Sequence, residues 1–182
     1  YNTAIGVNAL EANTTGNYNV AVGYLSLDQN TASYITAVGS GSLRYNISGE
    51  RNTGLGYRTL YANITGDNNV AVGHDALYDT TGSHNVGIGT ETSTSSSSAS
   101  NQIVIGHQAT GQADNSVVLG NSDVTAVYMA EDSGATIYAG NATFNGDVVI
   151  QSDARLKSNI VSLGSTLPKL LQIDGKLSLI HI

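Results

Sequence analysis

The sequence contains no cysteine and no tryptophan, and its 182 residues include one phenylalanine and one proline. The absence of cysteine excludes disulfide bonds as a source of stability. The scarcity of large aromatic side chains leaves few residues that could fill a conventional globular core. The 21 glycines, together with many Asn, Thr and Ser residues, instead supply turns and small side chains that suit β-structure. Something other than cross-links or a large core must hold this chain together.

Charge is also scarce, since only 12% of the residues are charged and the formal net charge is −7. Lys and Arg are almost absent before Arg155, so the basic surface of a nucleic-acid-binding protein is missing. No apolar run approaches the roughly 20 residues that span a bilayer, and no signal peptide opens the chain. We therefore predict no nucleic-acid partner and no membrane insertion. Tyr1 is not a natural start, so we expect further sequence upstream.

What the sequence does contain is a repeated pentapeptide that ends in glycine. Copies such as N-T-A-I-G, N-V-A-V-G and N-V-G-I-G recur at intervals of 14 to 17 residues. A repeat of this length cannot bury an apolar surface alone, so successive coils must stack. At about 4.8 Å per coil, eight coils give a rod of roughly 40 Å. The closing glycines are Gly6, Gly23, Gly39, Gly56, Gly73, Gly89, Gly106 and Gly120.

Each pentapeptide predicts a short strand, because side chains alternate between two faces and Asn and Gly bound the segment. The residue before the glycine is always aliphatic, and we predict that this row is buried: Ile5, Val22, Val38, Leu55, Val72, Ile88, Ile105 and Leu119. The preceding position points to the other face and holds Ala or Gly in six copies, which would let a neighbouring strand or a second subunit pack closely. This small-residue face suggests a trimer. A second row, predicted to help close the core, is Leu10, Leu27, Leu43, Leu60 and Leu77.

Turn signals such as N-T-T-G, N-I-S-G and N-I-T-G separate these rows, because Asn bonds to its own backbone and Gly accepts positive φ. The serine tract 92–100 has the composition of a linker, but the period continues through it. It is either an exposed loop within the solenoid or a flexible break. We predict an all-β parallel β-roll or β-solenoid of about eight coils over residues 1–120.

The eight pentapeptides resemble the head repeats of trimeric autotransporter adhesins, and the N-T-T-G variants look like those of phage tail-fibre proteins. The resemblance covers roughly residues 2–120. It implies a left-handed parallel β-roll in a homotrimer. After Gly120 the period is lost, and short strands joined by Asn and Gly turns predict a β neck over residues 121–151. We expect Phe144 to pack on the trimer axis of this neck.

The stretch S-D-A-R-L-K-S-N-I, from Ser152 to Ile160, follows the neck. On spacing alone, S-D could cap a helix and Lys157 could be a solvated charge. The full stretch closely resembles the start of the peptidase S74 family, an intramolecular chaperone at the ends of phage tail fibres and tail spikes. The resemblance implies that this domain drives trimerisation and then cuts itself off between Ser152 and Asp153. Ser152 would be the nucleophile and Lys157 its base, which requires a lysine with a lowered pKa.

The chain contains only the start of this chaperone domain. In the family the domain continues for on the order of 100 residues. Residues 152–176 would form its start, as a short helical remnant in which Leu156, Ile160 and Leu163 follow a helical period. The final segment, residues 177–182, departs from the family pattern, and we expect it to be non-native. Enzyme activity is therefore at most self-cleavage of the S74 type, and we expect this truncated chain to lack it.

Other candidate sites are weaker. His74, Asp75, Asp79 and His84 fall in one coil but match no metal-ligand spacing, so we predict no metal and no cofactor. The N-x-[S/T] triplets match glycosylation acceptors but also arise from corner chemistry. The ten tyrosines could form an exposed stripe for sugars, or they could cover coil edges.

These observations predict the structural shaft of a virion tail fibre or spike that takes part in host attachment. Its partners would be two further copies of the chain and a host surface receptor, for which a carbohydrate is one candidate. The alternative is a trimeric adhesin on a bacterial cell surface, although no heptads of a coiled-coil stalk are present. An enzyme acting on host polysaccharide would need two carboxylates held about 5 to 10 Å apart, and the sequence indicates no such pair.

Overall fold

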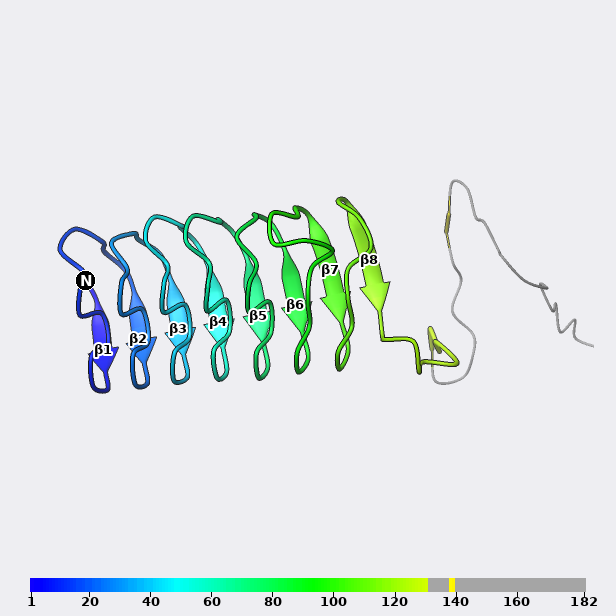
Figure 1. Ribbon diagram of the computed structural model, residues 1–182, viewed down its shortest axis with the longest axis horizontal. Coiled ribbons are helices and arrows are strands. Elements are labelled where there is room, and N and C mark those ends of the chain that lie inside the picture. The colour runs from blue at the N-terminus through cyan, green and yellow to red at the C-terminus, as the bar shows by residue number, and fades with distance from the viewer. Residues whose placement is uncertain (131–137, 140–182) are drawn as a thin grey trace, which may run out of the picture. The chain divides into compact units, whose positions relative to one another are not determined.

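The computed structural model describes residues 1–130, 138 and 139. One parallel sheet contains eight short strands in chain order, and the chain returns after each strand to begin the next coil (Figure 1). The predicted all-β solenoid is therefore confirmed, and the described residues contain no helix. The strands are β1 (Thr3–Ile5), β2 (Val20–Val22), β3 (Thr36–Val38), β4 (Thr53–Leu55), β5 (Val70–Val72), β6 (Val86–Ile88), β7 (Gln102–Ile105) and β8 (Ser116–Leu119).

The register of the sheet places equivalent residues of successive repeats directly beside one another. Val22 of β2 pairs with Val38 of β3, and Val38 pairs with Leu55 of β4. Hydrogen bonds between coils continue beyond the strands, as where the amide of Gly39 donates to the carbonyl of Val22 at 2.7 Å. Every repeat position therefore becomes a row of side chains along the sheet.

The prediction of which strand face is buried was wrong. In β2 to β6 the central residue lies inside the solenoid, where Ala21, Ala37 and Ala71 are fully buried. The aliphatic row before the glycines lies on the outside of the sheet, and its members Val38, Leu55, Ile88, Ile105 and Leu119 are 37–47% exposed. The small residues therefore face the core of their own chain, and the large aliphatic residues face away from it.

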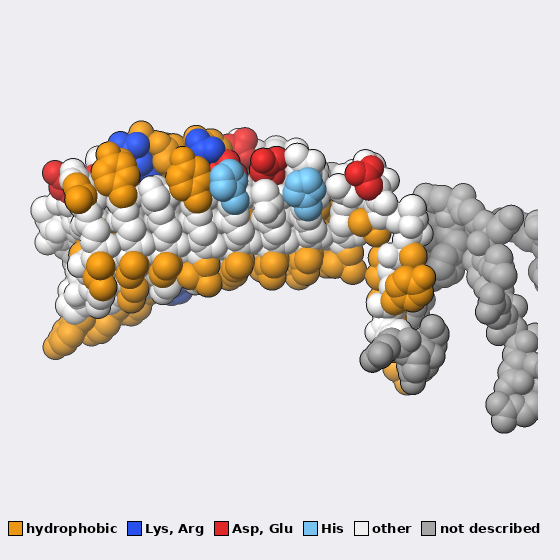
Figure 2. Space-filling view, turned by 90° about the horizontal axis from the view of Figure 1, so that it is seen from below, with side chains coloured by type: hydrophobic (Ala, Val, Ile, Leu, Met, Phe, Trp, Pro, Cys, Tyr) orange, Lys and Arg blue, Asp and Glu red, His pale blue; other side chains and the backbone are white. Residues whose placement is uncertain are grey.

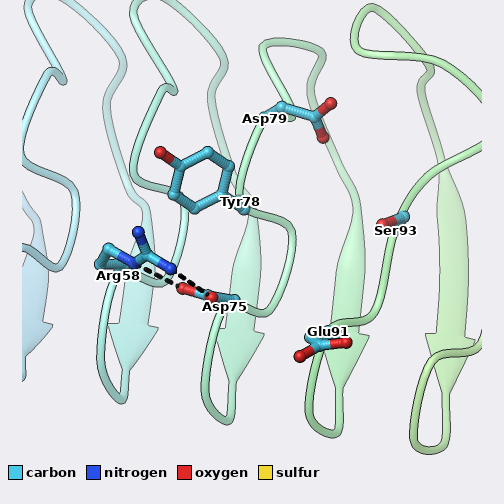
Figure 3. A pocket seen from close by; sticks show the side chains of 6 residues that line it. All are labelled: Arg58, Asp75, Tyr78, Asp79, Glu91 and Ser93. Atoms are coloured by element: carbon cyan, nitrogen blue, oxygen red, sulfur yellow. Dashed lines mark hydrogen bonds and ion pairs between the residues drawn. The ribbon is translucent and has the colours of Figure 1, made fainter.

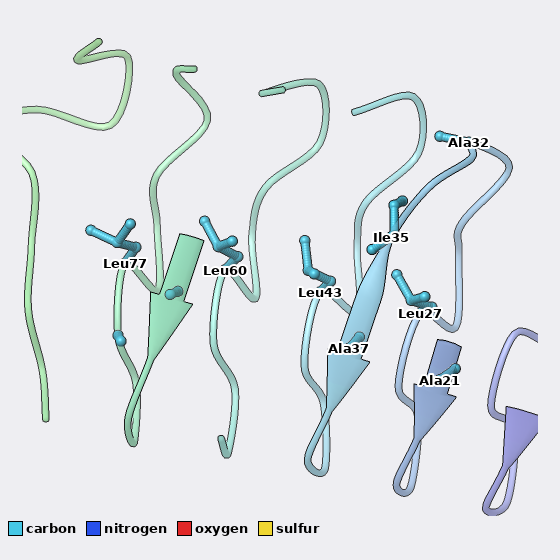
Figure 4. Packing of buried hydrophobic residues seen from close by; sticks show 10 residues of the cluster. Ala21, Leu27, Ala32, Ile35, Ala37, Leu43, Leu60 and Leu77 are labelled. Carbon is cyan, nitrogen blue, oxygen red and sulfur yellow. The ribbon is translucent and has the colours of Figure 1, made fainter. Parts of the chain in front are cut away.

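The leucine row explains this reversal. Leu27, Leu43, Leu60 and Leu77 are fully buried, as predicted, and lie beside the inward-facing strand residues (Figure 4). A Cβ added to Gly87 would lie 2.5 Å from Cγ of Leu77, so the coil has no room for a larger residue there. After Leu77 the leucine row stops, and Val104, which is fully buried, occupies the inward position of β7. Large and small residues thus compensate each other in volume across a thin core.

Two rows of asparagine side chains supply the polar part of the core. Asn69 accepts a hydrogen bond from the amide of Asn85 at 2.9 Å and donates to the carbonyl of Gly82 at 2.8 Å. In the second row, Asn63 donates to Asn46 at 2.9 Å and also closes its own corner by bonding to Gly66. These bonds confirm the predicted corner chemistry. They also explain why most pentapeptides begin with Asn, since the side chain connects adjacent coils.

The serine tract remains part of the stacked coils. Thr92, Thr94 and Ala99 are buried, whereas Ser95 to Ser98 are exposed, and the amide of Thr81 donates to the carbonyl of Ser97 at 2.6 Å. The tract is therefore an exposed loop within the solenoid. Residues 121–130 contain turns and bends but no strand. The rest of the predicted neck, including Phe144, and the predicted helical remnant lie outside the described residues.

Thr92 contains the one buried polar side-chain atom that lacks a hydrogen-bond partner within the described residues. At the equivalent position, Ser42 Oγ donates to the carbonyl of Gly54 at 3.2 Å and lies 2.8 Å from Thr59 Oγ1. A buried hydroxyl without a partner costs about 1–3 kcal/mol, so Thr92→Val should raise the free energy of unfolding by about 1 kcal/mol. Ser42→Ala should lower it by about the same amount. Urea unfolding followed by circular dichroism checks both, and a Thr92→Val protein as unstable as Ser42→Ala would contradict this reasoning.

Candidate interaction surfaces

The outward side of the sheet is a continuous apolar strip, here called the outer sheet face. It consists of the aliphatic row before the glycines and of the first outward residue of each strand. This second row holds Val or Ile in β2, β5, β6, β7 and β8 and Thr in β1, β3 and β4. Figure 2 shows this strip as a hydrophobic line along the lower side of the solenoid, with most of the charged side chains in view and the histidines along the opposite edge. Apolar patches of this kind on a protein surface mark sites of association.

The outer sheet face also lacks features that would keep it apart from another protein. In the described part of the chain, no Asp, Glu, Lys or Arg occurs in any of the eight strands. The strands are in register without offset, so the outward side chains form parallel rows. Monomeric soluble proteins rarely expose large contiguous apolar patches. The outer sheet face has the composition of a buried surface and is exposed in the single chain.

A second surface lies on the return segments, where two neighbouring hollows meet at Arg58. We call these together the lateral groove. The larger hollow, about 250 Å³, is lined by Arg58, Asp75, Tyr78, Asp79, Glu91 and Ser93 (Figure 3). Arg58 donates two hydrogen bonds to the Asp75 carboxylate, from Nε at 2.9 Å and from Nη2 at 2.6 Å. This hydrogen-bonded pairing raises the pKa of Arg58, so the guanidinium stays charged and fixed in place.

The smaller hollow, about 170 Å³, is lined by tyrosine rings, by Arg44 and Arg58, and by the small residues Ser40 and Gly41. Arg44 Nη1 donates to the hydroxyl of Tyr61 at 3.1 Å, and Arg44 Nε lies 3.4 Å from Asp28 Oδ2. The hydrogen bond to Tyr61 is the main cause of a raised pKa for Arg44. Both arginines therefore present a fixed planar group in the groove.

The tyrosines belong to several separate rows. Tyr1, Tyr18 and Tyr34 stack at one corner with ring centroids 5.2 Å apart, and the Arg51 guanidinium lies over the last ring. Tyr61 and Tyr78 stack on the return segments at 5.0 Å. The described tyrosines therefore do not form a single stripe but are divided between corners and return segments. Sequence reasoning missed the arginines of the lateral groove, although their spacing to Tyr and Asp in neighbouring repeats is visible in the sequence.

The residues of the possible metal site do not form one. No group of three or more His, Asp or Glu side chains suited to a metal ion occurs in residues 1–130, 138 and 139. His74 Nδ1 lies 3.4 Å from Asp75, but that carboxylate is already bonded to Arg58. His84 lies in a different row, following the corner positions of Tyr34 and Arg51. Of the glycosylation triplets, Asn46 and Asn63 are fully buried and hydrogen-bonded, so they are not open to a glycan.

The predicted cleavage site lies outside the described residues. Ser152, Asp153 and Lys157 all belong to that part of the chain, so their roles stay predictions from the sequence. Among the described residues, no helix of the length and hydrophobicity needed to cross a bilayer is found. No known protein family matches this chain, and comparison with curated proteins and with solved structures gives no match either.

Proposed function

We propose that this chain forms part of the shaft of a virion tail fibre or spike that takes part in host attachment. Three parallel copies pack their outer sheet faces together around a common axis. The segment from Ser152 onward begins a chaperone domain that drives this assembly and is removed by self-cleavage between Ser152 and Asp153. The shaft carries no cofactor, and its position is the virion.

The outer sheet face is the observation that supports this proposal most strongly. Its aliphatic row runs through all eight strands and is substantially exposed in the single chain. Burying apolar surface contributes about 25 cal/mol per Å², so covering this strip would stabilise a thin solenoid considerably. A second copy of the same chain offers a matching strip, because the rows of both copies have the same coil spacing. Association of identical rods also produces the elongated geometry of a fibre.

Three copies, in place of two, follow from the resemblance of the repeats to trimeric adhesin heads. The narrow apolar face on each rod suits a closed threefold arrangement, in which each chain presents this one face to the axis. The same repeats are compatible with a trimeric adhesin on a bacterial surface. The stretch from Ser152 to Ile160 favours the virion fibre, because its resemblance is to a chaperone of phage fibres and spikes.

The complete downstream reading frame tests the functional assignment. It should encode the remainder of an S74-type domain, and the protein expressed with that domain should yield a product ending at Ser152. Intact-mass spectrometry would measure the cut, and Ser152→Ala should abolish it while leaving the trimer intact. A reading frame that continues into a coiled coil and a membrane anchor, with no cleavage, would instead identify the adhesin.

A further inference from the structure

The lateral groove exists because one coil interrupts two rows of larger side chains. Tyr24 and Tyr57 occupy the position after the glycine in the coils on either side, where the intervening coil has Ser40. At the next position, Leu25 and Arg58 flank Gly41. Ser40 and Gly41 therefore leave a notch between Tyr24 and Tyr57. These two tyrosines lie two coils apart, a distance of about 9.6 Å. Tyr24 is 56% exposed and Tyr57 is 45% exposed, and the Tyr57 ring stacks on one side against His74 of the next coil with ring centroids 5.1 Å apart.

Polar groups line the part of the groove next to Tyr57. The Arg58 guanidinium lies 4.8 Å from the ring centroid of Tyr57 and 5.1 Å from that of Tyr78, and it is fixed by Asp75. Its Nη1 group donates to no other described residue, and its side chain is 36% exposed. Beyond it, Asp79 and Glu91 supply carboxylate oxygens that can accept hydrogen bonds (Figure 3). Donors, acceptors and aromatic surface therefore alternate along the groove.

The charges around the groove indicate which ligands it would accept. Its two arginines are outnumbered by carboxylates, because Asp28 and Asp75 already pair with them and Asp79 and Glu91 add two more. An anionic ligand would meet net negative charge. A purely apolar ligand would leave the fixed guanidinium and carboxylate groups without water or partners. A neutral ligand with many hydroxyl groups and one apolar ring face satisfies both constraints.

We propose that the lateral groove binds a neutral glycan chain that lies along the rod axis. Pyranose rings place their apolar faces against Tyr24 and Tyr57, and their hydroxyl groups bond to Arg58, Asp79 and Glu91. This proposal rests on the attachment function proposed above and names the class of receptor for it. The groove lies on the return segments, and most of the charged side chains in Figure 2 lie on the opposite edge from the outer sheet face, so each copy in a trimer retains an open groove. Three weak sites per fibre would then act together.

Binding can be measured on the full chain with soluble probes. Neutral oligosaccharides of glucose, galactose and mannose, and carboxylated and sulfated counterparts, would be titrated by isothermal calorimetry. We expect the unmodified chain to bind at least one neutral probe, and Tyr57→Ala to weaken that binding about tenfold. The double variant Ser40→Tyr, Gly41→Arg gives this coil the residues of its neighbours and should abolish binding without unfolding. Tyr34→Ala, which removes an exposed ring at another corner, is the matched control and should bind as the unmodified chain does.

The results of these titrations distinguish failure of the glycan-binding proposal from failure of the proposed shaft function. Binding of no neutral probe, binding of anionic probes only, or binding that survives the double variant would overturn the glycan groove. Equal loss in Tyr34→Ala would also overturn it. The solution mass of the same sample is measured in parallel. A trimer that binds no glycan refutes the groove alone, whereas a monomer refutes the shaft whatever the glycan result.

Discussion

Replacing Gly56 with alanine should destabilise the solenoid by at least about 3 kcal/mol. Gly56 has a φ of +138°, a conformation that side chains other than hydrogen rarely allow. A Cβ at this position would lie 2.2 Å from the carbonyl oxygen of Gly73 in the next coil. The obstructing atom is backbone, so relief requires the coils to separate and their inter-coil hydrogen bonds to lengthen. The free energy of unfolding, measured by urea titration with circular dichroism, gives the effect directly.

Gly41→Ala is the matched control for this experiment. Gly41 also has positive φ, at +68°, but the nearest atoms to an added Cβ are side-chain atoms of Tyr61 and Arg58 at 3.3 and 3.4 Å. Equivalent positions in other coils already hold Leu25, Arg58 and Asp75 with positive φ. The expected cost is therefore only about 1 kcal/mol. Equal unfolding midpoints for the two variants would show that close backbone stacking of the coils is not what requires glycine at Gly56.

Charges placed on the outer sheet face should abolish association of the chain. Leu55 and Ile88 point outward and are about 40% exposed in the single chain, so Leu55→Lys, Ile88→Lys should leave each coil folded. In an assembly these ammonium groups would be buried together without partners, at a cost of several kcal/mol for each charge. The dissociation constant should rise by about three orders of magnitude or more. Sedimentation velocity over a concentration series measures the change.

The control for this variant places the same two charges elsewhere on the surface. Ser96 and Ser98 are exposed in the serine tract, so Ser96→Lys, Ser98→Lys adds equal charge away from the sheet. This protein should associate as the unmodified chain does. If both double variants associate normally, the outer sheet face is not the interface. If the Leu55→Lys, Ile88→Lys variant unfolds, the outward side chains stabilise the fold of the single chain. The outer sheet face would then not be only an interface between copies.

The sequence predicted the architecture well because the repeat is directly visible. The glycine period gives the coil length and the in-register stacking, and the leucine row is buried as its spacing indicates. The Asn-rich corners also form as predicted, since Asn63 closes its turn with two bonds to Gly66. These features depend on local conformation and on the stacking of identical units, so a single chain is enough to predict them.

The assignment of the strand faces failed for a physical reason. A row of Val, Ile and Leu indicates burial but does not say whether the burial is within one chain or between chains. The space inside the coil decides the question, because a Cβ on Gly54 would lie 2.6 Å from both Ser42 Oγ and Thr59 Oγ1. That space depends on how tightly the return segment turns. The turns include Leu27, Leu43 and Leu60 at positive φ, a conformation that the identity of leucine does not suggest.

The lateral groove could not be predicted from the sequence for a related reason. Ser40 and Gly41 are ordinary turn residues when read along the chain, and their significance appears only beside Tyr24 and Tyr57 in the adjacent coils. Arg58 reads as an isolated surface charge until the stacking brings Asp75 to its guanidinium. Contacts between coils join residues about one period apart. These contacts can be found in the sequence only when each residue is compared with the residues one period before and after it.

The solution mass of the chain shows whether the aliphatic row on the outer sheet face is the shared core of three copies. Sedimentation equilibrium at micromolar concentration measures the number of copies. We expect a particle of three times the 18.8 kDa chain mass, with no change on moderate dilution. A mass of 18.8 kDa that stays constant with rising concentration would contradict the account.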